Sequence, residues 1–250
     1  VAYTGGLNIA DEYINKKKRF GYWKDTAVKI QGDAVDSFTV MFLEVWNVLE
    51  GGHLEERYLR ESKSSLAKDG FVIPYYDTPY NGEEIGKKVY LDIIHQAQES
   101  IYIMTPYFII DYEILYALCY SAKSGVDVKI ILPHIPDKRW IFYTSRTFYG
   151  ELLRAGVEVY EYLPGFLHAK SFASDGNKAV VGTVNMDYRS FYLHLECGAY
   201  FYNTPVSKEL EEDFIETLGV SQKITMDIVE DFPFYQRMIG RLMRLIAPLL

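Results

Sequence analysis

The residues of this chain best suited to chemistry are His168 and Lys170, two positions apart in the run HAKSFASD that ends at Asp175. An imidazole can attack phosphorus or donate a proton near neutral pH, and an ammonium group can bind phosphoryl oxygens. Residues two apart on a strand point to the same side, so a strand here would place both groups together. The spacing therefore predicts half of a phosphoryl-transfer site.

Polar residues further along the chain extend this candidate site. Asn185 follows the Gly182 turn and is expected to donate a hydrogen bond to phosphoryl oxygens. Glu196 is expected to accept the N–H of an imidazole and so fix its tautomer, with His194 close behind. A His-x-Lys pair alone is common by chance, whereas the same pair with GTVN at this distance is much rarer. The composite pattern favours a functional site.

The chain also contains an internal repeat, because VAYTGGLN at its start can be laid over KAVVGTVN at 178–185. Three positions coincide at an offset of 177: Ala2 and Ala179, Gly5 and Gly182, and Asn8 and Asn185. At that offset the counterpart of His168 would precede Val1. The sequence therefore predicts a first copy that lacks its own histidine motif here.

Hydrophobic periodicity predicts alternating helices and strands along most of the chain. Helices are expected from Ala34 to the glycine pair at 51–52 and at 83–98, 111–123 and 138–155; strands are expected at 1–5, 23–30, 101–104, 126–132, 157–162, 168–174, 178–183 and 196–202. Strands that alternate with helices of this length form parallel βαβ units with helices on both faces. The predicted fold class is α/β, with one complete half over about 75–205 and strand 1–5 in an incomplete second sheet.

The last segment, 232–250, has the pattern of a basic amphipathic helix. One helical face carries Arg237, Arg241 and Arg244, and the other carries Met238, Leu242, Leu245, Ile246 and Leu249. Two interpretations stay open: an element that lies on a membrane surface, or a helix docked on the core with its arginines outward.

Composition limits the partners. The net charge of −8 argues against a general nucleic-acid binder, because neutralising phosphates requires clustered Lys and Arg. Cys119 and Cys197 lie in apolar runs without a CxxC spacing, so reduced thiols are expected and a zinc site is not. No run of 18 apolar residues occurs, so the sequence predicts no bilayer-spanning helix.

Several stretches resemble those of a known family. HAKSFASD followed by GTVNMDYRSFYLHLE resembles the second HKD motif of bacterial cardiolipin synthases, which belong to the phospholipase D superfamily. GGLNIADEYINKKKRFGYWKDT is similar to the segment after that family's first HKD motif. PYFIID, LPHIPDK and the tail PFYQRMIGRLMRLIAPLL are also similar to segments of the family, so the resemblance covers almost the whole chain.

The resemblance implies a phospholipase D-like fold of two similar α/β halves that share one site. It divides this chain into the remainder of the first half (1–53), a linker or solvated helix (54–70), the second half (71–220) and the basic amphipathic tail (221–250). It also implies phosphatidyl transfer in two steps, without metal or other cofactor. One histidine attacks a phosphatidylglycerol phosphate, the other protonates the departing glycerol, and a second phosphatidylglycerol accepts the phosphatidyl group.

Residue roles follow from the same resemblance. Asp175 is nevertheless expected to be structural, because five residues along the strand and turn carry it away from Lys170. His194 stands where many members of the family have Asn. The catalytic residues are expected to be His168, Lys170 and Asp175, and the phosphate-binding residues are expected to be Lys170, Asn185 and Asn8. Glu196 and His194 are expected to support these residues without contacting the phosphate.

The expected partners are anionic phospholipid, with phosphatidylglycerol as substrate, and a membrane surface; nucleic acid is not expected. The parent protein is expected in the bacterial cytoplasmic membrane, with this fragment soluble or peripheral on the cytoplasmic side and inactive alone. Two other functions stay open: a phospholipase D-type phosphodiesterase or nuclease, and a one-motif lipid-binding module without catalysis. A homodimer that pairs two His168 motifs is a further alternative.

Overall fold

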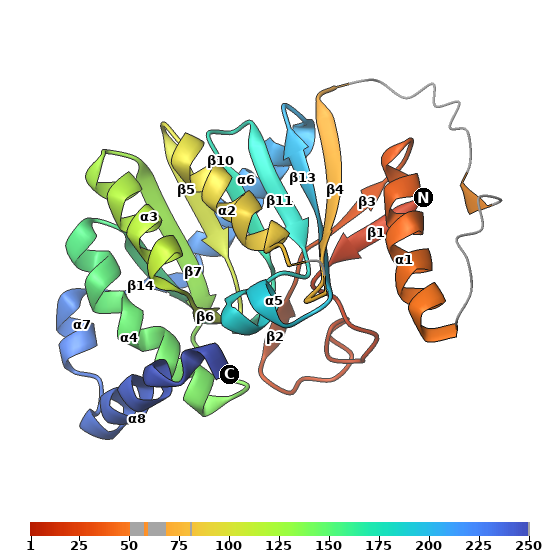
Figure 1. Ribbon diagram of the computed structural model, residues 1–250. Helices are drawn as coiled ribbons and strands as arrows, with labels where there is room; N and C mark the ends of the chain where they lie inside the picture. The colour runs from red at the N-terminus through yellow and green to blue at the C-terminus, as the bar shows by residue number, and fades with distance from the viewer. Residues whose placement is uncertain (51–57, 60–68, 81, 250) are drawn as a thin grey trace.

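The computed structural model describes residues 1–50, 58–59, 69–80 and 82–249. Most of the predicted linker, 54–70, lies outside the described residues. One mixed eight-stranded sheet forms the centre of the molecule (Figure 1). The strands follow the order β14 (Ser221–Lys223), β8 (Glu158–Tyr162), β7 (Asp127–Pro133), β5 (Ser100–Met104), β10 (Ser171–Ser174), β11 (Lys178–Gly182), β13 (Glu196–Tyr202) and β4 (Phe71–Asp77).

The predicted α/β fold is confirmed, and its central sheet is mixed. Strands β5, β7 and β8 run parallel, and every other neighbouring pair in this sheet is antiparallel. The expected helices are present as α2 (Ile85–Gln96), α3 (Tyr112–Lys123) and α4 (Arg139–Ala155). Local chemistry sets the ends of two of them. Asp111 caps the start of α3 by accepting from the Ile114 N–H, and Gly156 ends α4 at a φ of 97°.

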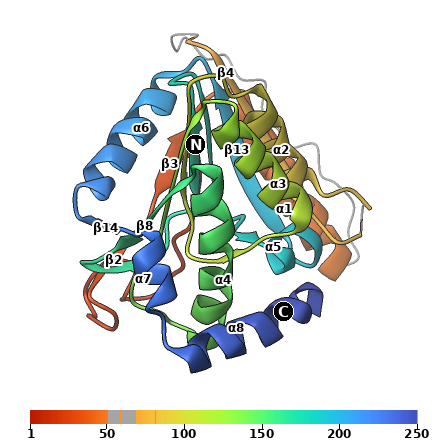
Figure 2. The same ribbon diagram turned by 90° about the vertical axis from the view of Figure 1, so that its left-hand side faces the viewer.

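Helices cover both faces of the sheet. Ile101 and Ile103 of β5 belong to the large apolar cluster under α2, α3 and α4. Met104 faces the other way and packs in a cluster with Phe214 of α6 (Pro205–Leu218). Figure 2 shows α6 on the side opposite α2 and α3. The alternation of a strand thus divides its side chains between two cores.

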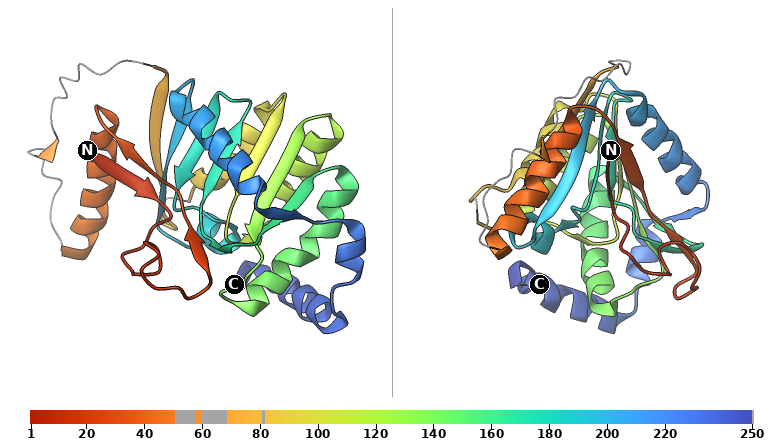
Figure 3. Two further views of the ribbon diagram at one scale, coloured as in Figure 1. Left: turned by 180° about the vertical axis from the view of Figure 1, so that it is seen from behind. Right: turned by 90° about the vertical axis from the view of Figure 1, so that its right-hand side faces the viewer.

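The first 50 residues form a small unit beside β4, β11 and β13 (Figure 3). Within the described part of the chain, strands β1 (Ala2–Gly5) and β3 (Ala27–Ile30) pair only with each other, as an antiparallel two-stranded sheet. This confirms that the strand near the start belongs to a sheet separate from the large one. The prediction of a single strand at 23–30 is wrong, because β2 (Tyr22–Lys24) and β3 are separate strands. Helix α1 (Ala34–Glu50) follows and contacts β4.

The internal repeat is visible in the strand pairing. Gly5 of β1 pairs with Ala27 of β3, and Gly182 of β11 pairs with Gly198 of β13. A Cβ on Gly5 would lie 2.3 Å from the Thr26 carbonyl oxygen, and one on Gly182 would lie 2.4 Å from that of Cys197. The two glycines are needed for the same reason, because each lets two backbones approach closely.

Candidate active site

His168 and Lys170 lie in the short connection between β9 (Gly165–Leu167) and β10. The prediction of a strand over 168–174 is therefore wrong at its first three residues, because regular strand pairing begins at Ser171. The two side chains still meet. The Lys170 Nζ lies 2.9 Å from Nδ1 and 3.0 Å from Nε2 of His168, and it donates to the His168 carbonyl oxygen at 2.6 Å.

A carboxylate from the first part of the chain holds the imidazole. The Asp25 Oδ2 lies 2.8 Å from the His168 Nδ1. Strand β2 pairs in parallel with β9, and the His168 N–H donates to the Lys24 carbonyl at 2.7 Å, which sets the position of Asp25. Glu196, expected to accept from an imidazole, does not hold His168; the partner of this ring is Asp25.

Aromatic rings surround the imidazole. The ring centroids of Tyr13, Trp23 and Phe166 lie 5.1, 5.5 and 5.8 Å from that of His168, which is only 8% exposed. Burial lowers the pKa of His168, and the hydrogen bond with Asp25 opposes this shift. An ionised carboxylate only accepts hydrogen bonds, so Nδ1 carries the proton and Nε2 of the neutral ring keeps its lone pair. Nε2 is the atom able to attack phosphorus.

Lys170 is buried close to several carboxylates. Burial lowers its pKa to about 8, although the negative charges of Asp25, Glu196, Asp187 and Asp137 favour the ammonium form. Lys170 is only 5% exposed. A cation that is poorly solvated in this way gains more than an exposed lysine when an anionic phosphate arrives.

Glu196 belongs to a second polar cluster. Its carboxylate accepts from the Thr183 hydroxyl and, at 2.9 Å, from that of Ser190. Asn185 joins this cluster because its Nδ2 donates to the Ser190 Oγ at 2.9 Å. The Asn185 Oδ1 is buried without a hydrogen-bond partner among the described residues. Burial raises the pKa of Glu196.

His194 lies at the edge of this second cluster. Its Nδ1 is 3.5 Å from the Glu196 carboxylate, and its Nε2 accepts from the Arg189 Nε at 2.5 Å. A cavity of about 280 Å³ adjoins it. The residues that line the cavity include Tyr107, Trp140, Asn185, Asp187, His194 and Ala247.

Asn8 and Asp175 do not touch the imidazole. Asn8 is exposed and donates to the Tyr13 hydroxyl at 2.8 Å, so it reaches His168 only through the Tyr13 ring. Asp175 has a φ of 53° and accepts from the backbone N–H groups that precede and open β5. Burial alone would raise the pKa of Asp175, but these N–H groups hold it below its usual value. Its contacts are those of a structural residue.

Sequence reasoning missed Asp25, although the repeat contains the signal for it. Matching Ala27 with Gly198 through the strand register also matches Asp25, just before β3, with Glu196 at the start of β13, each two positions earlier in the chain. The connection between the paired strands is six residues longer in the first copy, so the offset of 177 no longer applies there. The two carboxylates therefore occupy equivalent places in the two halves.

The mixed sheet with helices on both faces and a buried His-Lys pair defines a phospholipase D-like protein. The family model described as "Cardiolipin synthase, PLD-like domain" matches residues 90–218, just over half of the chain. The chain belongs to this family. The matched range includes His168, Lys170, Asn185 and Glu196.

Relatives match over the full length of this chain. It is 48% identical to an uncharacterized protein of Streptococcus mutans, of which the match covers 54%. It is 43% identical to a cardiolipin synthase of Alkalihalophilus pseudofirmus and 41% identical to one of a Geobacillus species, in each case over 50% of that protein. The chain thus spans about half the length of the curated relatives it matches.

Solved structures share the fold. A phosphatidylserine synthase of Haemophilus influenzae aligns with 99% of this chain and 68% of its own, at a TM-score of 0.73 and 15% identity. Nuc, a phospholipase D family member of Salmonella typhimurium, aligns with 62% of this chain and 97% of its own, at a TM-score of 0.53 and 20% identity. At these identities the likeness concerns the fold.

Proposed function

We propose that this chain is the second-motif part of a cardiolipin synthase, which transfers a phosphatidyl group between two phosphatidylglycerol molecules. The observation that carries the proposal is the buried His168, with Asp25 on Nδ1 and the Lys170 ammonium beside the ring. This arrangement leaves Nε2 as a nucleophile or acid next to a cation for the phosphoryl oxygens. Relatives named cardiolipin synthase, matched over the whole chain, favour lipid over nucleic acid.

The proposed reaction has two displacements at phosphorus. One imidazole nitrogen forms a bond to phosphorus as the bond to the glycerol oxygen breaks, and a second imidazolium protonates that oxygen. The hydroxyl of another phosphatidylglycerol then attacks, the P–N bond breaks, and the second imidazole removes the hydroxyl proton. The products are cardiolipin and glycerol, and no oxidant or cofactor enters the balance.

His168 supplies one of the two histidines, and the other would come from the parent protein's first motif. The equivalence of Asp25 and Glu196 supports this pairing. Asp25 of the first half orients the histidine of the second half, so we infer that Glu196 orients the histidine of the first. Asn185 is linked to Glu196 through Ser190 and would donate to the same phosphate.

A homodimer that pairs two His168 motifs is the less favoured alternative. Tyr13 and Trp23 of the first part of the chain already pack against the imidazole. A second copy would therefore have to approach past these residues.

We propose that the parent protein acts at the bacterial cytoplasmic membrane, where its substrates reside.

The proposal is tested with the full-length parent protein and vesicles of phosphatidylglycerol. His168→Gln should abolish cardiolipin formation and any acid-labile phosphohistidine that depends on this residue. The matched control is His95→Gln, because His95 is an exposed residue on α2 far along the chain from the motif. Substantial cardiolipin formation by the His168→Gln protein would overturn the assignment.

A further inference from the structure

Helix α8 (Phe234–Leu245) lies across α4 at the lower edge of the molecule in Figures 1 and 2. The contact is close at one glycine. A Cβ on Gly240 would lie 2.3 Å from the Tyr143 carbonyl oxygen and 2.8 Å from the Thr147 Cγ2, so only glycine lets the helices approach this far. Gly240 therefore fixes which face of α8 is turned to the core.

The face of α8 turned away from the core is apolar. Phe234, Met238, Leu242 and Leu245 follow one another at helical spacing and are 73%, 47%, 57% and 80% exposed. The docked helix expected from the sequence is present, and two of its three arginines, Arg237 and Arg241, are exposed as that interpretation required. The helix also presents its apolar row to the surroundings.

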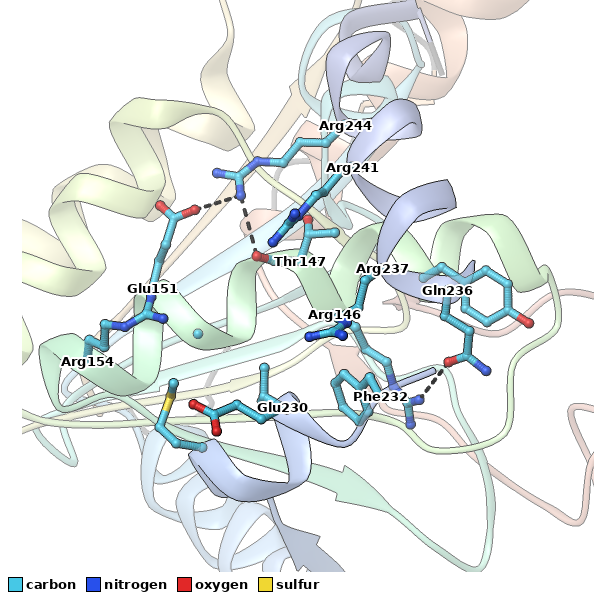
Figure 4. Close-up of a pocket in the computed structure, with 14 residues that line it drawn as sticks. Arg146, Thr147, Glu151, Arg154, Glu230, Phe232, Gln236, Arg237, Arg241 and Arg244 are labelled. Carbon is cyan, nitrogen blue, oxygen red and sulfur yellow. Dashed lines mark hydrogen bonds and ion pairs between the residues drawn. The ribbon is translucent and has the colours of Figure 1, made fainter. Parts of the chain in front are cut away.

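The arginines lie along one flank of α8, beside this row. The Arg244 guanidinium donates to the Glu151 carboxylate at 2.7 Å and to the Thr147 carbonyl oxygen. Arg237 and Arg241 are exposed, and their guanidinium groups form no hydrogen bond or ion pair with any described residue. They border a cavity of about 280 Å³ between α4, α7 (Met226–Glu230) and α8, as Figure 4 shows.

The remaining charges around this cavity leave a positive excess. Glu151 is paired with Arg244, and Arg146 is held by Glu161 through two hydrogen bonds. Glu230 is the other acidic residue in its lining, against the arginines Arg154, Arg237 and Arg241. The protein as a whole carries a net charge of −8, so this flank is a local exception.

The chain after α8 also reaches the edge of the molecule where Asn185 and His194 lie, here called the catalytic edge. Ala247, just after α8, lines the same cavity as Asn185 and His194. Leu245, the last residue of the apolar row, is two positions before Ala247, so this end of the row is close in the chain to that cavity. A phospholipid whose phosphate must reach the candidate active site keeps its acyl chains in a bilayer, so the bilayer must approach this edge.

We propose that α8 is a membrane-docking helix that seats the catalytic edge on a bilayer containing anionic phospholipid. The apolar row enters the boundary between headgroups and acyl chains, and Arg237 and Arg241 bind lipid phosphates beside it. The choice of a catalytic edge rests on the proposed function. A second copy of the chain is less suitable as the occupant, because antiparallel pairing of two α8 helices would bring their arginine flanks together.

The test measures co-flotation of the 250-residue chain with vesicles, which requires no turnover. Wild type should float with phosphatidylcholine vesicles that contain phosphatidylglycerol and much less with pure phosphatidylcholine. Leu242→Gln/Leu245→Gln should weaken binding to the mixed vesicles at least about tenfold. Its control is Ile215→Gln/Val220→Gln, which changes one exposed apolar residue within α6 and one just after it. This variant should bind as wild type does.

Charge is tested separately. Arg237→Gln/Arg241→Gln should weaken binding to the mixed vesicles roughly tenfold and leave binding to pure phosphatidylcholine unchanged. Lys123→Gln/Lys208→Gln removes the same charge from α3 and α6 and should have little effect. Circular dichroism of each variant checks that the fold is kept.

Three results would overturn the proposal. Wild type could fail to float with the mixed vesicles, or the α8 variants could float as well as their controls. Sedimentation could also show a dimer that Leu242→Gln/Leu245→Gln dissociates, which would make this face an interface between copies. Turnover of the parent protein on dispersed short-chain phosphatidylglycerol keeps the two proposals separate, because it reports catalysis without vesicle docking.

Discussion

The Asp25 carboxylate lies 2.8 Å from the His168 Nδ1, although 143 positions separate the two residues. The contact joins the first copy of the repeat to the His-Lys motif of the second. It exists because β2 and β9 pair in parallel and bring the ends of two distant strands together. The candidate site is therefore a product of both parts of the chain.

Asp25→Asn is expected to lower the pKa of His168 further, because it removes the negative charge that stabilises the imidazolium. In the full-length parent, phosphatidyl transfer should fall roughly 10²–10⁴-fold, since an amide can hold the wrong tautomer. NMR titration of His168 measures the first effect and a lipid assay the second. Asp231→Asn, at an exposed site, is the control. An unchanged or higher pKa would contradict the assigned role of Asp25.

The 250-residue chain alone is expected to form no cardiolipin. It presents one His-Lys motif, and the reaction needs a second acid for the leaving oxygen, worth roughly 10²–10⁴-fold in rate. The lipid assay compares this chain with the full-length parent at equal concentration. Turnover by the short chain that matches the parent's would show that one motif is sufficient, and the account of the incomplete repeat would then be wrong.

Lys170→Met is expected to change how stability depends on pH. The folded-state pKa of about 8 lies below the ordinary lysine value of 10.5, so between these pH values the unfolded state binds more protons. The free energy of unfolding of wild type should therefore gain on the order of 3 kcal/mol from Lys170 as pH rises through this window. Urea titrations of both proteins from pH 7.5 to about 10.5 measure the difference. Equal slopes would show that Lys170 keeps an ordinary pKa.

Asp175→Ala is expected to reduce the free energy of unfolding by about 3 kcal/mol, because backbone N–H groups at the start of β5 lose a charged acceptor. Asp175→Asn should lose less, since Asn keeps an acceptor oxygen and tolerates a φ of 53°. The lowered pKa of Asp175 contributes stability at neutral pH that is lost as pH falls below about 4. Thermal melts at two pH values test both statements. Equal melting of Asp175→Ala and wild type would refute the structural role.

Gly182→Ala is expected to cost roughly 1–3 kcal/mol in the free energy of unfolding, because its Cβ would lie 2.4 Å from the Cys197 carbonyl oxygen. Gly5→Ala should have a similar effect through the equivalent contact with Thr26. Gly219→Ala, whose nearest contact would be 3.3 Å, is the matched control. Denaturant melts compare the three. A Gly182→Ala protein as stable as the control would show that β11 and β13 can separate without loss.

Some features were not visible in the local pattern. Strand β4 reads FVIPYYD, and Pro74 within it obscures the signal of a strand, although the strand lies at the edge of the sheet where proline is tolerated. Helix α6 begins at Pro205 and was not predicted, although proline in the first turn is a common way to start a helix. Both elements depend on the sheet they cover or extend.

The sequence by itself determined the His168–Lys170 pair, the α/β alternation and the repeat, because these depend on residue type and short spacing. The tertiary structure decided that Asp25, rather than Glu196, holds His168, since strand pairing over 143 positions follows no local period. It also decided the orientation of α8. An amphipathic pattern shows that a helix has two faces, but only packing, here at Gly240 against α4, determines which of them meets the core.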